Sequence, residues 1–221
     1  MQLGTILNQL FGVALIKNLK SSTARKDHIS SECKQINLSF EIFEAVNGKL
    51  HVGSNFTLIH GPYLLSYPSS AGYIGNQMTS HKIITHAIES SYSSIMMLDD
   101  DCIFSHTSGC SESVIKDIEE QLPKDWDIII LGDIYGDPVT NQRISYRKCV
   151  EHHEAAGSHG VAINSKVFSE LQYLFSNTSF LGDGAIGRLI DINKNVYKLM
   201  PSICTQDRKI LSDINEIIHT W

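Results

Sequence analysis

The chain has 221 residues, 42% of them hydrophobic and 19% charged, and this is the composition of an ordinary globular protein. Its formal net charge of −6 and its lack of a sustained lysine and arginine run argue against nucleic acid as a main partner. No stretch approaches the roughly 20 apolar residues of a spanning helix, and the first residues lack the basic segment of a signal peptide. The five cysteines follow no metal-binding or disulfide pattern. We therefore expect a single domain over residues 1–221 of a cytoplasmic protein, with no membrane span and with reduced thiols.

Strands and helices alternate along the chain. Short apolar runs predict strands at 11–17, 38–46, 95–98, 126–131, 160–163 and 196–200. Helical spacing and capping residues predict helices at 23–36, 75–91, 111–122, 165–175, 183–192 and 210–218. Two polar stretches are expected to be loops, 49–70 with a short hairpin and 133–156 without regular structure. This alternation predicts a three-layer α/β domain built on a mostly parallel sheet.

Three consecutive aspartates, Asp99, Asp100 and Asp101, follow the apolar strand at 95–98, and we call them the aspartate triplet. Open α/β sheets bind ligands at the carboxyl ends of their strands. Adjacent ionised carboxylates repel one another and are costly near a core unless a cation compensates them. Mg²⁺ and Mn²⁺ prefer such oxygen ligands. A solvated acidic turn is the alternative, but the apolar strand in front of the triplet favours a cation site.

Several segments resemble glycosyltransferase family 25, the lipopolysaccharide and collagen-type sugar transferases. In chain order they are 13–20 with Ser22 and Arg25, 43–48, 72–75 with Ser80-His81, 98–101, 126–129 with 131–132, 157–160 with Ile163, and finally Asp183 and Gln206. The resemblance extends from about residue 12 to residue 207. It departs from the usual pattern at three positions: Asp99 stands for Glu, Asn47 for Asp and Ser21 for a basic residue.

The resemblance implies a GT-A fold, a nucleotide-sugar donor and a divalent cation, Mn²⁺ or Mg²⁺. A cation held by carboxylates can neutralise the charge that develops on a nucleoside diphosphate leaving group. Alternation along a strand places Asp99 and Asp101 on one side, so these two are the expected metal ligands. The donor-binding residues implied by the resemblance are Asn18, Leu19, Arg25, His81 and Asp100. Arg25 could instead be a surface charge, and His81 a core histidine.

Transfer with inversion needs a base that takes the proton from the acceptor hydroxyl, and a carboxylate suits this role. Asp183 matches the late acidic position of the family and is the expected catalytic base, although it could equally cap the helix that follows. Glu154 and Asp133 are reserve candidates in loops. Three further histidines fit no standard zinc spacing and are interpreted as exposed loop residues: His152, His153 and His159.

These observations predict a metal-dependent glycosyltransferase that moves a hexose from a UDP-sugar to a hydroxyl of a glycan or protein acceptor. A non-catalytic relative that binds a sugar nucleotide or a partner is one alternative. A haloacid-dehalogenase-type phosphohydrolase is another, because Asp99-x-Asp101 and Gly132-Asp133…Asp137 are similar to its first and last motifs. Against it, the nucleophile strand would lie unusually late in the chain.

Overall fold

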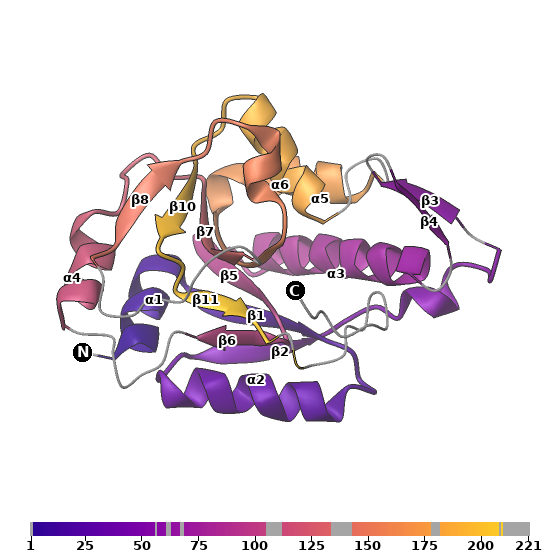
Figure 1. The fold of residues 1–221 in the computed structure, drawn as a ribbon, viewed down its shortest axis with the longest axis horizontal. Coiled ribbons are helices and arrows are strands. Elements are labelled where there is room, and N and C mark those ends of the chain that lie inside the picture. Colours follow the sequence, from indigo (N-terminus) through magenta and orange to yellow (C-terminus); the bar gives the residue numbers. More distant parts are fainter. Residues whose placement is uncertain are drawn as a thin grey trace.

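The structure is a computed structural model that describes residues 2–55, 57–60, 63–66, 69–104, 112–133, 143–177, 182–207 and 209 (Figure 1). The expected helix at 210–218, Ser111 and Asp137 lie outside the described residues. No helix in the described part of the chain is long and apolar enough to cross a membrane.

Seven strands form the central sheet, in the spatial order β2-β1-β5-β9-β7-β10-β8. They are β1 (Val13–Asn18), β2 (Phe40–Glu44), β5 (Ser94–Asp99), β7 (Ile128–Asp133), β8 (Ser145–Lys148), β9 (Ser158–Asn164) and β10 (Val196–Met200). β1 pairs in parallel with β2 and β5, and β10 pairs in parallel with β7. β9 runs antiparallel between β5 and β7, and β8 is antiparallel at the edge. The prediction of a mostly parallel sheet is confirmed.

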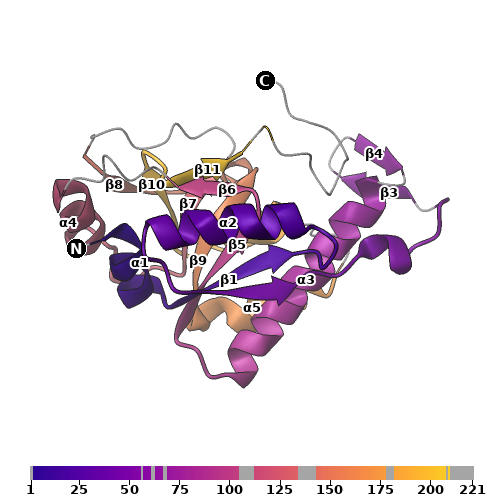
Figure 2. The same ribbon diagram turned by 90° about the horizontal axis from the view of Figure 1, so that it is seen from below.

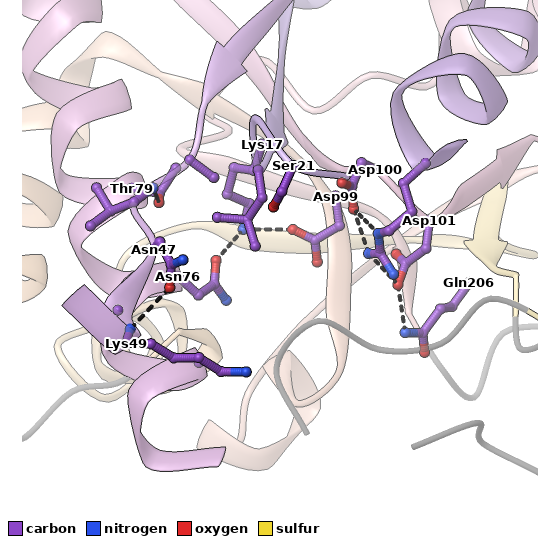
Figure 3. A pocket seen from close by; sticks show the side chains of 16 residues that line it. Lys17, Ser21, Asn47, Lys49, Asn76, Thr79, Asp99, Asp100, Asp101 and Gln206 are labelled. Carbon is purple, nitrogen blue, oxygen red and sulfur yellow. Dashed lines mark hydrogen bonds and ion pairs between the residues drawn. The ribbon is translucent and has the colours of Figure 1, made fainter. Parts of the chain in front are cut away.

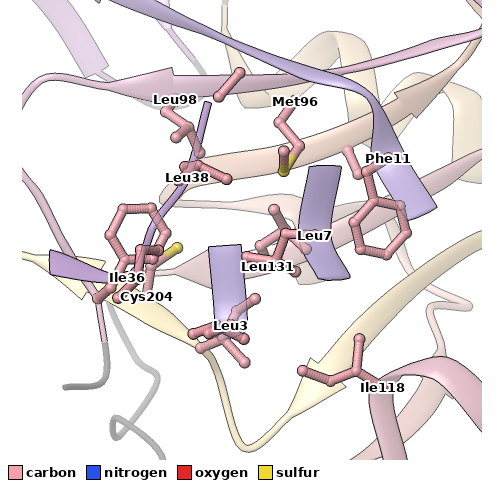
Figure 4. Close-up of a cluster of buried hydrophobic side chains, with 14 of the residues drawn as sticks. Leu3, Leu7, Phe11, Ile36, Leu38, Met96, Leu98, Ile118, Leu131 and Cys204 are labelled. Carbon is pink, nitrogen blue, oxygen red and sulfur yellow. The ribbon is translucent and has the colours of Figure 1, made fainter. Parts of the chain in front are cut away.

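Helices cover both faces of this sheet and make three layers (Figures 1 and 2). They are α1 (Leu3–Phe11), α2 (Thr23–Gln35), α3 (Ser69–Glu89), α4 (Glu112–Glu120), α5 (Phe168–Phe175) and α6 (Asp183–Asp191). Buried side chains of α1, α2 and α4 form one apolar cluster with one face of the strands, shown in Figure 4. Those of α3, α5 and α6 form a second cluster with the other face. On β1, Ala14 and Ile16 belong to the first cluster and Leu15 to the second, as strand alternation requires.

The amino-terminal helix α1 is absent from the sequence prediction, which began the first strand at Phe11. Phe11 is instead the last residue of α1, and its ring packs edge-on against Trp126 with centroids 5.5 Å apart. Gly12 follows with a φ of 82°, a conformation that L side chains rarely adopt. The glycine separates the helix from β1, so the strand begins at Val13.

The stretch 133–156, expected to be irregular, contains the edge strand β8 and a 3₁₀ helix at His152–Ala155. β8 pairs only with β10 among the described strands, and its side chains are largely exposed. A polar, solvent-facing edge strand has no apolar pattern to reveal it. Two further 3₁₀ helices lie at Gly48–Leu50 and Ser165–Val167. The expected hairpin within 49–70 is confirmed as β3 (Thr57–His60) and β4 (Tyr63–Ser66).

A small second sheet lies next to the central one. β6 (Cys102–Phe104) pairs antiparallel with β11 (Cys204–Gln206), so Gln206 is in register with Cys102. Two glycines let β11 approach the central sheet closely. A Cβ on Gly132 would lie 2.0 Å from the Cys204 carbonyl oxygen, and one on Gly160 would lie 2.7 Å from the Cys204 Sγ. This packing brings β11 to the end of β5.

Candidate active site

A cavity of about 530 Å³, which we call the large cavity, lies at the carboxyl ends of β1, β2 and β5 (Figure 3). Its walls come from the ends of these strands, from residues 45–49 after β2, from α3 and from Gln206 of β11. All three residues of the aspartate triplet line it, together with Leu19 and Arg25. The aspartate triplet therefore lies at the carboxyl edge of the sheet, as expected, and a cavity is present there.

Asp100 is almost fully buried and is held by two elements. It accepts hydrogen bonds from Asn18 Nδ2 at 2.6 Å and from Arg25 Nε at 2.8 Å. Burial raises the pKa of the Asp100 carboxyl, and the hydrogen bonds from Arg25 and Asn18 oppose this rise. Asn18 itself is 3% exposed and is not one of the residues that line the large cavity, and its amide binds Asp100. Arg25 is therefore no free surface charge, because its side chain is only 12% exposed.

Asp101 is held through one of its two oxygens. Its Oδ2 accepts from Arg25 Nη2 at 3.1 Å and from Gln206 Nε2 at 2.9 Å. Its Oδ1 is buried and has no hydrogen-bond partner among the described residues. The expected strand alternation is wrong beyond Asp99, because β5 ends there and the next two residues form a turn. Asp100 and Asp101 consequently converge on the same guanidinium group.

Asp99 is the most exposed residue of the triplet, with a side chain 27% exposed, and it pairs with a different cation. Lys17 Nζ lies 2.7 Å from Asp99 Oδ1 and donates to Asn76 Oδ1 at 2.8 Å (Figure 3). Burial lowers the pKa of Lys17, the ion pair with Asp99 raises it, and the net change is upward. Lys17 is thus a positive charge held at a fixed place in the wall of the large cavity.

Asp183 lies beside the large cavity rather than in it. It lines a second cavity of about 20 Å³, the small cavity, whose wall includes Lys17 and Asn76 of the large one. The N-cap of α6 is Gly182, so the alternative that Asp183 caps this helix is wrong. Asp183 Oδ2 instead accepts a hydrogen bond from the Gly157 N–H at 2.6 Å. Burial and the negative charge of Asp99 raise the pKa of Asp183 to about 7. A carboxyl group with this pKa can exchange a proton near neutral pH.

His81, an expected donor-binding residue, lines neither of these two cavities in the described part of the chain. The reserve candidate Glu154 has a structural role, because it accepts from the Val150 and Glu151 N–H groups and pairs with Arg147. Burial by itself raises the pKa of Glu154, but these contacts lower it to about 2, which is unsuitable for a base. The side chain of Asp133 lies outside the described residues.

The interpretation of the three histidines as exposed is confirmed for two of them. The side chains of His152 and His153 are 50% and 76% exposed, and each lies close to a carboxylate. The interpretation is wrong for His159, which is 5% exposed within β9. The described residues include no cluster of three or more histidine, cysteine or acidic side chains that could hold a metal ion.

Three residues of the site escaped the list drawn from the sequence: Lys17, Asn76 and Gln206. A signal existed for Lys17, since a lysine near the end of the buried strand β1 needs a partner. Gln206 belongs to the positions that resemble the family, but the resemblance gave it no role in the site, and Asn76 carries no comparable signal. Each of the two makes its contact with a residue far away in the sequence. Lys17 and Asn76 are 59 residues apart, and Gln206 and Asp101 are 105 apart.

A profile of glycosyltransferase family 25, described as LPS biosynthesis protein, matches residues 12–181 of the chain. The cavity therefore lies within a domain of the glycosyltransferase class. The chain belongs to glycosyltransferase family 25. No curated protein matches it.

Two solved structures are similar to the chain at low sequence identity. One is a glycosyltransferase involved in the glycosylation of the major capsid of PBCV-1, with a TM-score of 0.39, 9% identity, and 74% of this chain and 64% of that chain covered. The other is a mutant of Drosophila β-1,4-galactosyltransferase 7 in complex with manganese, UDP-Gal and xylobiose. Its TM-score is 0.40, with 11% identity, 94% of this chain and 71% of that chain covered. The chain thus spans a little under two thirds of the first structure.

Proposed function

We propose that this protein is a metal-dependent glycosyltransferase that moves a hexose from a UDP-sugar to a hydroxyl group of a glycan or protein. The observation that carries the proposal is the aspartate triplet in the wall of the large cavity, inside the region that matches the family. A carboxylate-lined cavity at the carboxyl edge of an α/β sheet suits a nucleotide diphosphate bound with a cation. Leu19, Arg25 and Asp100 belong to the donor site in this proposal, with Asn18 behind them, and His81 does not.

Mn²⁺ or Mg²⁺ fits the residues present. Asp101 offers a buried carboxylate oxygen, Oδ1, that lacks a donor among the described residues, and such an oxygen is costly unless a cation or proton compensates it. Mg²⁺ is commonly held by one or two carboxylates while substrate phosphates and water complete its shell. In the proposal Asp101 binds the ion directly, and Asp99 contributes directly or through water. The bound ion supplies neutralisation of the charge on the leaving diphosphate.

The chain's own residues hold this arrangement in place. Arg25 and Lys17 fix the aspartate triplet from two sides, so the carboxylates keep one geometry before the donor binds. Such fixed charges need little reorganisation when substrate arrives. Lys17 also places a positive charge between the large cavity and Asp183.

Asp183 is the base in this proposal, and it takes the proton of the acceptor hydroxyl. Its pKa of about 7 matches the requirement that a base be largely deprotonated yet still basic near neutral pH. The small cavity beside it has room for about one water molecule, through which a proton can pass if the hydroxyl lies further away.

The proposal is tested with a panel of UDP-sugars, in which release of UDP is measured with Mn²⁺ and with EDTA, with and without acceptor sugars. We expect metal-dependent release from one donor, strongly reduced in Asp101→Ala and retained in Asp191→Ala. Asp191 is a suitable control because it is an aspartate at the exposed end of α6, where it pairs with His152.

Other outcomes identify the alternatives. UDP binding that depends on Mn²⁺, without release from any donor, would identify a non-catalytic sugar-nucleotide-binding protein. Hydrolysis of an aryl phosphate that is lost in Asp99→Asn would identify a phosphohydrolase. Absence of UDP binding with and without Mn²⁺ would exclude the proposed donor.

A further inference from the structure

The two oxygens of Asp101 have different surroundings. Oδ2 receives two hydrogen bonds, one from Arg25 and one from Gln206, at 3.1 and 2.9 Å. Oδ1 is buried, yet it has no hydrogen-bond partner in the described part of the chain. The residue as a whole is 5% exposed, so bulk water does not satisfy this oxygen. A buried carboxylate oxygen without a partner is rare in folded proteins and needs a compensating group, such as a cation or a water molecule.

Gln206 reaches Asp101 because of the way β11 is packed. The strand lies against Gly132 and Gly160 and pairs with β6, which places Gln206 opposite Cys102. The next residue binds the same aspartate through the backbone, since the Asp207 N–H donates to the Asp101 carbonyl oxygen at 2.7 Å. Asp101 is therefore held by the Gln206 side chain, as Figure 3 shows, and also by a main-chain group from the same short segment.

We propose that Gln206 is a positioning residue for the metal site. Gln206 and Arg25 both donate to Oδ2 and so fix the rotation of the Asp101 carboxylate. Of the two Asp101 oxygens, only Oδ1 is then left to bind the divalent ion. The inference rests on the proposed function, because it deepens the role given there to Asp101. Partners that orient a metal-binding carboxylate commonly change metal affinity 10- to 100-fold when they are removed.

The chemistry of glutamine suits this role better than a charged residue would. The Asp101 carboxylate already shares the Arg25 guanidinium with Asp100. A second cation at position 206 would compete with a divalent ion for the carboxylate, and an acidic residue would repel it. The amide donates a hydrogen bond without adding charge, so the orientation is fixed while the negative charge stays available.

The test measures Mn²⁺ affinity in the presence of saturating UDP, by electron paramagnetic resonance of the free ion. Gln206→Met keeps the length of the side chain but removes the donor, and we expect about a tenfold weaker Mn²⁺ affinity. Thr205→Val, on the same strand, is the matched control and is expected to leave this affinity unchanged. UDP affinity measured in EDTA and the thermal midpoint of Gln206→Met should remain close to those of the wild type. A purely structural role would instead move both of these quantities.

The outcomes separate this inference from the proposed function. Wild-type Mn²⁺ affinity in Gln206→Met would overturn the inference and leave the proposed function standing. Absence of Mn²⁺ binding by the wild type with UDP would overturn both. Should Gln206→Met fail to fold, Gln206→Asn keeps the amide but moves it back by one methylene, and the same loss of affinity is expected from it.

Discussion

Two acidic sites lie close together at the same edge of the sheet, and they differ in how their charge is compensated. The aspartate triplet (99–101) is bound by two cationic side chains, Lys17 and Arg25. Asp183 is instead bound by backbone N–H groups of Gly157 and the residue after it. Burial and the negative charge of Asp99 raise the pKa of Asp183 to about 7.

The difference separates two chemical tasks. Ion pairs with Lys17 and Arg25 hold the three carboxylates of the triplet in one geometry and compensate only part of their charge, which suits the binding of a cation and a diphosphate. The carboxyl group of Asp183 is placed where its charged form is disfavoured, which suits transfer of a proton near neutral pH. Substitutions at each site test whether cation binding and proton transfer are separated in this way.

The largest effect is expected from Asp183→Asn, which should lower kcat/KM for sugar transfer by about 10³, within the usual range for loss of a catalytic base. The binding of UDP with Mn²⁺ should be retained, because the triplet is untouched. Release of UDP under subsaturating donor gives kcat/KM, and Asp191→Asn on the same helix is the control. A loss smaller than tenfold would show that another group takes the proton.

Arg25→Met tests the other site through stability. The substitution leaves buried Asp100 without the guanidinium group that binds it, and breaking a buried ion pair in this way costs about 3 kcal/mol or more. Urea unfolding at neutral pH measures the loss. Arg188→Met is the matched control, because Arg188 and its partner Asp191 have side chains that are 45% and 37% exposed. The loss of unfolding free energy expected for this exposed pair is about 0.5 kcal/mol. Equal losses in both variants would contradict the view that the triplet depends on internal cations.

The difference in stability between Asp183→Asn and the wild type should depend on pH. The pKa of Asp183 is about 7 in the folded protein against an ordinary value of 3.8, so wild-type stability falls as the pH rises from about 4 through about 7. Asparagine does not ionise. Above about pH 7 the variant should therefore be more stable, by about 1–2 kcal/mol once partial exposure is allowed for, and the difference should vanish below about pH 4. Chemical denaturation at both pH values measures it, and a constant difference would refute the raised pKa.

The sequence predicted the sheet and the triplet because both depend on local patterns. Apolar runs specify the buried strands, and a charged cluster directly after β5 must lie at the edge of the sheet. β8, β6 and β11 were missed because each is short or exposed and forms through pairing with strands elsewhere in the chain. The contact of Gln206 with Asp101 depends on this pairing and could not be predicted either.

His81 shows how a correct helix can still mislead about a site. The α3 residues that line the large cavity are Gly72, Asn76 and Thr79, spaced by four and three positions on one face of the helix. His81 lies two positions after Thr79 and therefore on another face. The family resemblance pointed to residues 72–75 and 80–81, which lie within α3, but the helical phase decides which side chains reach the cavity.

Lys17→Met should reveal the smallest and most specific effect, since Lys17 lies between the two sites. It pairs with Asp99, and its positive charge lowers the pKa of Asp183. Removing it also frees the negative charge of Asp99, so both changes raise the pKa of Asp183.

Because a base is active only when deprotonated, the acid limb of the pH profile of kcat/KM should move upward by about one pH unit. The profile is measured from UDP release between about pH 5.5 and 8.5, with Lys82→Met as the control because Lys82 is an exposed lysine on α3. An unmoved limb in Lys17→Met would mean that the two acidic sites titrate independently. A shifted limb would mean that the lysine that pairs with the donor-site carboxylate also sets the pH at which the base works.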